Sequence, residues 1–332
     1  MVKGTRCEGI TIYKGSWPLT TDLTIITPCF NEEASVQVCA DRVRDVMARE
    51  LPQVSYEHIF SDNASTDATL ETLRKIAQGD MRVKVVVNSR NVGPFRNIYR
   101  AMSKSTGRAI VPMLPADLQD PVEIIPEFYR EWKEGTLVVF GERTNRQESF
   151  FMRMLRGIYY RMIRRFADGQ IPINSGEFML IDRKIAENLL VLKDHYPYIR
   201  GLVAQSTDNW KSVKYTWVKR EQGKSKSNPL ALIDQAINGL ISTSRVPARL
   251  ALLGGFAFSG IGILAGLWSL IANLIFEPGV SHGIPTLIVA LFIFGGIQLF
   301  FLGLIGEYVL SIHAQVRQTP PAFDVELINF KD

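Results

Sequence analysis

The stretch "LTIITPCFNEE", residues 23–33, joins a short apolar run to a polar loop. Residues 23–27 are β-branched or apolar, as in a buried strand, and the loop at 28–33 supplies an amide and two carboxylates directly after them. A helical pattern follows at 33–49. A strand, a polar loop and a helix in this order predict the first unit of an α/β fold.

The same order of strand and helix continues as far as residue 141. Further apolar runs lie at 56–61, 83–88, 109–114 and 136–141, with helical patterns between them at 67–78, 95–105 and 121–133. Near-continuous apolar strands that alternate with helices predict a parallel sheet covered on both faces. Because ligands bind such sheets beyond the carboxyl ends of the strands, we expect the chemistry in the loops that follow the strands.

Those loops are rich in carboxylates and amides. After the first loop come "DNASTD" at 62–67, "SRNVGP" at 89–94 and "PADLQD" at 115–120. Each polar residue taken singly could cap the following helix, but jointly the loops predict a polar rim suited to a ribose and a metal-bound phosphate. No G-x-G-x-x-G follows the first strand and no G-x-x-x-x-G-K-[ST] occurs anywhere, which disfavours dinucleotide dehydrogenases and P-loop enzymes.

Charge and hydropathy predict a protein anchored in a membrane. The formal net charge is +5 and the pI is about 9.0, which suits anionic lipid or phosphate partners, and we expect no nucleic acid partner. No residue is charged from 250 to 276 or from 283 to 306, and each run is long enough to cross a bilayer as a helix. A buried hairpin in a soluble core is the alternative. The connector at 277–283 has no Lys or Arg, whereas Arg245 and Arg317 flank the spans, so we expect both flanking parts in the cytoplasm.

One further segment, residues 148–169, is basic and amphipathic. Its apolar side chains fall on one helical face, and the rest of the surface carries arginines: Arg153, Arg156, Arg161, Arg164 and Arg165. By periodicity alone, it could equally be a helix that packs on the core with a solvated side. The neighbouring spans favour an interfacial helix that lies on anionic lipid.

Several stretches carry a family resemblance. "TIITPCFNEE" (24–33), "SDNASTDAT" (61–69), "NSRNVG" (88–93) and "ADLQDP" (116–121) resemble the successive motifs of family 2 glycosyltransferases. "INSGEFMLIDRK" (173–184), "REQGKSKSN" (220–228) and "LGLIGEY" (302–308) resemble the dolichyl-phosphate mannose synthase-like branch, the bacterial polyprenyl-phosphate glycosyltransferases. The resemblance covers residues 22 to 318. It implies a GT-A fold, which is α/β and Rossmann-like with a mostly parallel sheet, followed by a two-helix transmembrane hairpin.

The resemblance also implies roles for individual residues. Nucleotide-binding residues are implied in three loops: Pro28, Phe30, Asn31, Glu32, Asp62, Asn91 and Gly93. Cations are implied on the diphosphate, at Arg220 and Lys226, and on the acceptor phosphate, at Arg143 and Arg146. Asp117 and Glu177 are the implied catalytic residues, with Glu177 in place of the family's Asp. Because a phosphate monoester has a second pKa of about 6 and needs little help from a base, Glu177 is also suited to positioning the acceptor or the sugar.

The implied metal site departs from the family pattern. The family's D-x-D-x-Q sequence holds Mg²⁺ or Mn²⁺ against the diphosphate; here Asp117 and Gln119 match, whereas Pro115 replaces the first Asp. Mg²⁺ commonly binds one or two protein carboxylates, with phosphate oxygens and waters completing its shell, so we expect a modified, weakened site. Asp120 is either a substitute ligand or a cap for the next helix. A pseudoenzyme with a dead metal site is the alternative.

The predicted organisation follows from these motifs. It comprises an N-terminal extension at 1–21, a GT-A domain at 22–228, a juxtamembrane segment at 229–249, spans at 250–276 and 283–309, and a cytoplasmic tail at 310–332. The resemblance implies inverting transfer of a sugar from a nucleotide sugar, UDP- favoured over GDP-, to an undecaprenyl phosphate-like polyprenyl phosphate. The expected setting is the cytoplasmic face of the bacterial inner membrane, in a homo-oligomer that modifies cell-envelope glycans. Two alternatives stay open: a catalytically impaired nucleotide-sugar or lipid-binding homologue, and a glycan-extending family 2 synthase.

Overall fold

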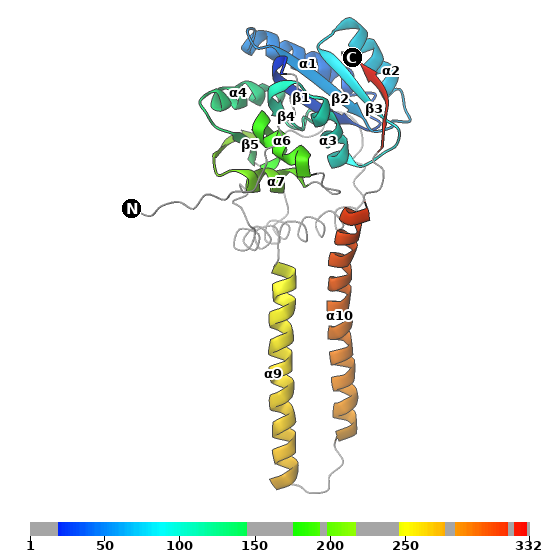
Figure 1. Cartoon of the computed structure of the whole chain (residues 1–332), viewed down its shortest axis with the longest axis vertical. Coiled ribbons are helices and arrows are strands. Elements are labelled where there is room, and N and C mark those ends of the chain that lie inside the picture. The colour runs from blue at the N-terminus through cyan, green and yellow to red at the C-terminus, as the bar shows by residue number, and fades with distance from the viewer. Residues whose placement is uncertain are drawn as a thin grey trace, which may run out of the picture. The chain divides into compact units, whose positions relative to one another are not determined.

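The computed structural model describes most of the chain (Figure 1). The described residues are 19–144, 175–192, 198–216, 246–275, 283–317 and 322–330. The predicted interfacial helix at 148–169 lies outside them, as do Arg146, Arg220 and Lys226.

The described strands form one eight-stranded sheet in the order β7-β5-β6-β4-β1-β2-β3-β8. Four of them occur in the first part of the chain: β1 Thr21–Cys29, β2 Tyr56–Asp62, β3 Val83–Asn88 and β4 Gly107–Val111. The others are β5 Val138–Thr144, β6 Ser175–Asp182, β7 Trp210–Thr216 and β8 Asp324–Ile328. The block β3-β2-β1-β4 is parallel, β6 is antiparallel between β4 and β5, and β5 pairs with β7 in parallel. The predicted mostly parallel α/β sheet is therefore confirmed.

Helices cover both faces of the sheet (Figure 1). One face packs against α1 Val36–Glu50, α2 Thr69–Gly79 and the 3-10 turn η1 Val122–Ile124 that leads into α4 Ile125–Lys133. The other packs against α3 Pro94–Lys104, α6 Arg183–Leu192 and α7 Ile199–Ser206. Alternation along β1 sends Leu23 and Ile25 to the first face and Ile26 to the second. This two-sided burial explains why apolar residues occur at successive positions of the parallel strands and do not strictly alternate with polar ones.

Two long apolar helices follow, α9 Val246–Ile275 and α10 Gly283–Arg317. By length and composition, the part of α10 from Ile293 to Arg317 can cross a membrane, whereas the apolar stretch Leu253–Trp268 of α9 is shorter than that test requires. Their large apolar side chains are exposed, including Trp268 and Phe300. One candidate span is therefore found among the described residues, and the second predicted span stays a prediction.

The last strand, β8, is a feature that the sequence analysis did not predict. Residues 324–328, placed in a cytoplasmic tail, form an antiparallel edge strand beside β3. Residues from the far end of the chain therefore complete the same sheet that begins with β1.

Candidate active site

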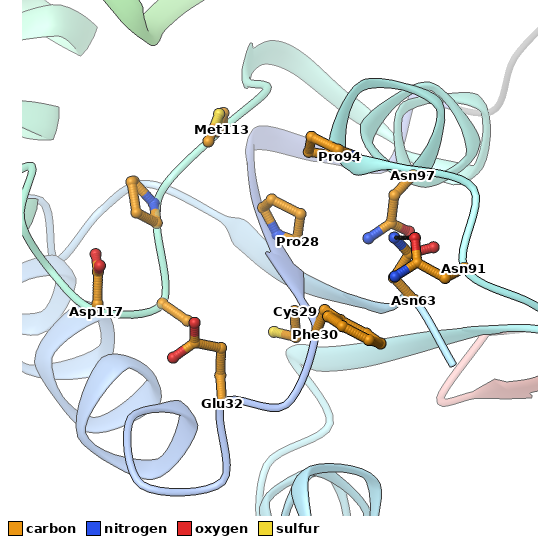
Figure 2. A pocket seen from close by; sticks show the side chains of 12 residues that line it. Pro28, Cys29, Phe30, Glu32, Asn63, Asn91, Pro94, Asn97, Met113 and Asp117 are labelled. Carbon is orange, nitrogen blue, oxygen red and sulfur yellow. Dashed lines mark hydrogen bonds between the residues drawn. The ribbon is translucent and has the colours of Figure 1, made fainter. Parts of the chain in front are cut away.

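A pocket of about 270 Å³ opens where the parallel strands end. Its lining comes from the end of β1, the loops after β1, β2, β3 and β4, and the first turn of α3, the place that strand topology predicts. The lining residues are Pro28, Cys29, Phe30, Glu32, Asn63, Asn91, Pro94, Asn97, Met113, Pro115, Ala116 and Asp117 (Figure 2). Of the predicted nucleotide-binding residues, the structure thus brings Pro28, Phe30, Glu32 and Asn91 together with Asp117.

Polar groups of two kinds divide the pocket. In the view of Figure 2, the carboxylates of Glu32 and Asp117 lie on one side of Pro28. The amides of Asn63, Asn91 and Asn97 lie on the other side. Amides offer both donors and acceptors to a base or a sugar, whereas carboxylates suit hydroxyls and cations. The arrangement fits a ligand that carries both hydroxyl groups and metal-bound phosphate.

The loops hold three residues in the left-handed region of backbone conformation. Asn31, Ala64 and Leu118 have φ values of 56°, 60° and 54°, although none is glycine. The strain at Asn31 is compensated because its Oδ1 accepts a hydrogen bond from the backbone N–H of Thr66 at 2.7 Å. Asn31 does not line the pocket; it joins the loops after β1 and β2. Such backbone strain is found where the surrounding structure fixes functional side chains.

Asp62 is the last residue of β2 and is almost fully buried, with 1% of its surface exposed. Its Oδ2 accepts a hydrogen bond from the backbone N–H of Ser65 at 3.2 Å, whereas its Oδ1 accepts none in the described part of the chain. Burial raises the pKa of Asp62. A buried carboxylate oxygen without a donor is costly, so a donor from a ligand would be strongly favoured here.

The amide side of the pocket is internally bonded. Asn63 Nδ2 donates to Asn91 Oδ1 at 2.9 Å, and Asn63 Oδ1 accepts from the backbone N–H of Val92 at 3.0 Å. The backbone N–H of Gly93 also donates to Asn91 Oδ1, at 2.9 Å. Gly93 has a φ of +81°, a conformation that favours glycine, and it turns the chain into Pro94 at the start of α3. The predicted residues Asn91 and Gly93 therefore shape the loop that holds Asn63.

The predicted metal residues lie in a tight turn. Leu118 donates its backbone N–H to Pro115 O at 3.1 Å, and Asp117 Oδ1 accepts from the backbone N–H of Gln119 at 3.3 Å. No group of three His, Cys, Asp or Glu side chains comes together anywhere in the described ranges. Asp117 lines the pocket, whereas Gln119 is not among the lining residues. One carboxylate is chemically sufficient for Mg²⁺ or Mn²⁺ when phosphate oxygens and waters fill the other positions, so the metal site with Gln119 stays a prediction.

Asp120 is neither a spare metal ligand nor a helix cap, which corrects both readings of the sequence. Its buried carboxylate accepts hydrogen bonds from Arg143, at 2.8 and 3.1 Å, and from the hydroxyl of Tyr215 at 2.5 Å. Arg143 Nε also donates to Tyr215 Oη at 3.0 Å. A Cβ added to Gly176 would lie 3.1 Å from the guanidinium carbon, a tight contact, so the glycine leaves room for Arg143 in this position. The predicted acceptor cation is thus held rigidly.

Glu177 is not among the residues that line the pocket. Its Oε2 accepts a hydrogen bond from the backbone N–H of Arg200, in the first turn of α7, at 3.2 Å. A carboxylate at a helix N-terminus is stabilised by the unpaired N–H groups and the helix dipole. Burial raises the pKa of Glu177, and the charges of Arg200 and Arg143 oppose that rise. The structure therefore gives Glu177 a role in holding α7, and its catalytic role stays a prediction.

The sequence analysis missed several lining residues. Asn63 stood in the quoted loop "DNASTD", but only its neighbour Asp62 was assigned a role. Asn97 is inside α3 and is 1% exposed, and a buried amide within an amphipathic helix was the available signal. Met113 lies between β4 and the turn at 115–119, and it belongs to no motif that the sequence analysis quoted.

Comparison with known proteins shows the family to which the chain belongs. The family model "Glycosyl transferase family 2" matches residues 24–190. The uncharacterized glycosyltransferase YkcC of Bacillus subtilis (strain 168) is 35% identical over 298 residues, which are 90% of this chain and 91% of YkcC. The bactoprenol glucosyl transferase of Shigella phage SfII is 29% identical over 299 residues, 90% of this chain and 96% of the relative. Among solved structures, the mannosyltransferase PcManGT from Pyrobaculum calidifontis, in complex with GDP-Man and Mn²⁺, has 16% identity and a TM-score of 0.45 over 92% of this chain and 90% of its own. The chain therefore belongs to glycosyl transferase family 2 and is a glycosyltransferase.

Proposed function

We propose that this glycosyltransferase moves a sugar from a nucleotide sugar, with UDP favoured over GDP, to a polyprenyl phosphate at a membrane surface. The observation that carries the proposal is the pocket at the ends of β1 to β4, with its carboxylate and amide sides. The acceptor class is supported by the 29% identity to a relative named bactoprenol glucosyl transferase, aligned over 90% of this chain.

The nucleotide occupies the loops after β1, β2 and β3 in this proposal. Pro28 and Phe30 offer apolar surface to the base, and Glu32 and Asn91 offer hydrogen-bonding groups to the ribose. Asp62 Oδ1, buried and without a donor in the described residues, suits a base N–H that approaches through the loop.

The reaction is a single in-line displacement. A phosphate oxygen of the acceptor forms the bond to the anomeric carbon, while the bond from that carbon to the nucleotide diphosphate breaks and its electron pair leaves with the diphosphate. The acceptor oxygen already carries negative charge at neutral pH, so no proton must be removed. Arg143, held by Asp120 and Tyr215, is the cation proposed to bind the acceptor phosphate.

A divalent cation would be held by Asp117 and Gln119 together with phosphate oxygens of the donor. When bound, it would neutralise charge on the leaving diphosphate. Arg220 and Lys226 are proposed to share that task, by analogy with the family loop that they resemble.

The apolar helices are proposed as the membrane anchor. Side chains as large as Trp268, 72% exposed, and Leu299, 70% exposed, would be costly in water and favourable in lipid. The proposed setting is the cytoplasmic side of the bacterial inner membrane, where nucleotide sugars are made available and polyprenyl phosphates reside.

The test is a turnover assay with the full-length protein in detergent. We expect transfer from one member of a panel of UDP- and GDP-sugars to undecaprenyl phosphate in the presence of Mg²⁺ or Mn²⁺. A matched control replaces undecaprenyl phosphate with undecaprenol, which lacks the nucleophilic phosphate and should give no product. Nucleotide binding without turnover for any donor would favour the catalytically impaired homologue. Transfer to a growing glycan instead of the lipid would favour the synthase.

A further inference from the structure

The C-terminal strand β8 reaches the loop that shapes the pocket. A β-bulge lies between its Glu326, which pairs with Val87, and its Asp324, which pairs with Asn88 at the end of β3. Bulges redirect side chains at sheet edges. Just before the strand, Phe323 O accepts from the backbone N–H of Ser89 at 3.0 Å, and the Phe323 N–H donates to Ser89 Oγ at 3.2 Å. The strand is therefore bonded to the first residue of the loop at 89–94.

Arg100 on α3 connects β8 to the end of β3. Its guanidinium donates to the carboxylate of Asp324 and to the carbonyl of Ala322, and its Nε donates to Asn88 Oδ1 at 2.6 Å. Lys104 Nζ lies 3.2 Å from the second oxygen of Asp324. The side chains of Arg100 and Asp324 are each only 18% exposed. A partly buried guanidinium with acceptors on several sides has one strongly preferred orientation.

Asn88 connects Arg100 to the pocket through the two ends of its amide group. Arg100 has only donors, so the atom of Asn88 that faces it must be the amide oxygen, and Nδ2 must point the other way. That Nδ2 donates to Asn97 Oδ1 at 2.6 Å. Asn97 Nδ2 in turn donates to Ser61 O at 2.8 Å. Asn88 and Asn97 are 2% and 1% exposed, and Asn97 lines the pocket (Figure 2).

We propose that Asp324 is a positioning residue for the nucleotide pocket. Its carboxylate fixes Arg100, Arg100 fixes the amide of Asn88, and Asn88 fixes the amide of Asn97 against the ligand. The proposal rests on the proposed function, because it assumes that the pocket binds a nucleotide. It also gives the segment directly after α10 a task in donor binding.

A purely structural role for β8 makes a different prediction. An edge strand protects β3 and would stabilise the fold without any effect on the pocket. Loss of Asp324 would then lower the Tm but leave the nucleotide affinity of the folded protein unchanged. Only a positioning role moves both quantities.

The experiment measures UDP and GDP binding by calorimetry, with kinetics, on the full-length protein in detergent. We expect Asp324→Ala to weaken binding of the preferred nucleotide by about fivefold or more, in the range typical of coupled sites. The donor KM should rise, while kcat and the acceptor KM stay within about twofold of wild type. Asp324→Glu, which keeps the charge, should recover part of the affinity.

Glu326→Gln is the matched control. Glu326 is on the same strand, and its side chain forms an exposed ion pair with Arg74 at 2.5 Å. Within the described residues, neither side chain of this pair bonds to Arg100, Asn88 or Asn97. The substitution should leave the nucleotide affinity unchanged. In an Asn97→Ala background, Asp324→Ala should cause no further loss of affinity, because the end of the path is missing.

Equal affinities for wild type, Asp324→Ala and Glu326→Gln would overturn the positioning role and leave the proposed function intact. Wild type that binds neither UDP nor GDP would overturn the proposed function, and the positioning role with it. Should Asp324→Ala fail to fold, Asp324→Asn has the same shape and is read by the same criteria.

Discussion

Asp62 combines a buried carboxylate, an oxygen without a donor in the described residues and a pKa raised by burial. In the unfolded chain the group ionises at its ordinary pKa, whereas the folded protein retains the proton to a higher pH. The contribution of Asp62 to stability is therefore complete below the ordinary pKa and is lost as pH rises through the folded pKa. A carboxylate kept at such a cost in stability is typical of a binding site.

Asp62→Asn should separate stability from binding. The Tm of the variant relative to wild type should increase as pH rises from about 4 to 7, because Asn has no charge to desolvate. UDP affinity should fall by about tenfold or more, as expected when a hydrogen bond to a charged group worth roughly 1.5 kcal/mol or more is lost. Thermal denaturation across pH and calorimetry measure the two effects.

Asp67→Asn is the control of opposite sign. The pKa of Asp67 is lowered, because hydrogen bonds, chiefly from Thr69, outweigh the desolvation that would raise it. Its stabilising contribution exists above the ordinary pKa and is lost as pH falls through the folded pKa. The variant should therefore lose stability relative to wild type at neutral pH. The same trend in both variants would contradict the assignment for Asp62.

Substitution of Pro115 tests whether the loop at 115–119 binds a metal ion. Pro115→Asp adds a carboxylate beside Asp117, so the Mg²⁺ or Mn²⁺ concentration for half-maximal rate should fall by about tenfold. Pro115→Asn has nearly the same shape without the charge and should not lower it, although both lose the fixed φ of proline. Asp117→Ala should nearly abolish activity. Metal titration of the initial rate is the measurement, and full activity of wild type in chelator would show that Arg220 and Lys226 carry the diphosphate charge.

At the scale of elements, the hydrophobic pattern of the sequence predicted the strands and helices that depend on neighbouring residues alone. The strands β1 to β5 and the helices α1 to α4 occur where apolar runs and helical periodicity placed them. The insertion of β6 between β4 and β5 has no local signal, because it depends on pairing between distant residues. β8 is five residues long and alternates between exposed and half-buried side chains, so its pattern is too weak to distinguish it from a tail.

The same division holds for the candidate site. Pro28 lies at the end of β1, and Glu32 and Asp117 lie in the loops after β1 and β4, so the strand-end rule finds them. Asp120 belongs to a polar motif, but its carboxylate is occupied by the hydrogen bonds from Arg143. The sequence could not reveal this contact, because a helix separates the loop after β4 from β5 along the chain. Asn97 can be assigned to the site only when the packing of α3 against β2 and β3 is known.

The pairing of β5 with β7 gives a prediction at this scale. In the register of β5 and β7, Arg143 lies opposite Tyr215. The tyrosine hydroxyl accepts a hydrogen bond from Arg143 and donates one to Asp120. Tyr215→Phe removes that hydroxyl and leaves the Arg143–Asp120 pair, so the acceptor KM should rise by about fivefold, the factor for roughly 1 kcal/mol. The UDP affinity should not change, and it serves as the internal control. An unchanged acceptor KM with a lowered Tm would make this cluster a structural one.

At the scale of the whole molecule, the sheet constrains the membrane topology. β8, which follows α10, lies in the same sheet as β1 to β7, which precede α9. Both ends of the intervening segment must therefore lie on the same side of a membrane. The chain can cross that membrane only an even number of times, so if α10 crosses, α9 must cross too. The shorter apolar stretch in α9, Leu253–Trp268, is then extended by tilt, local thinning of the bilayer or its flanking residues.

Labelling of single cysteines in intact cells tests this topology. Of the three native cysteines, Cys29 and Cys39 are buried, so replacing Cys7 with Ser gives a suitable background. With a reagent that does not cross membranes, a cysteine at Ser281 should be labelled from outside, in agreement with the absence of Lys and Arg at 277–283. Cysteines at Ser225 and at Phe323, a position 70% exposed beside β8, should be labelled only after permeabilisation. Labelling of Phe323→Cys from outside would mean an odd number of crossings and would contradict the pairing of β8 with β3.

No labelling at Ser281 before permeabilisation would mean that neither helix crosses the membrane. The anchor would then have to lie on the membrane surface.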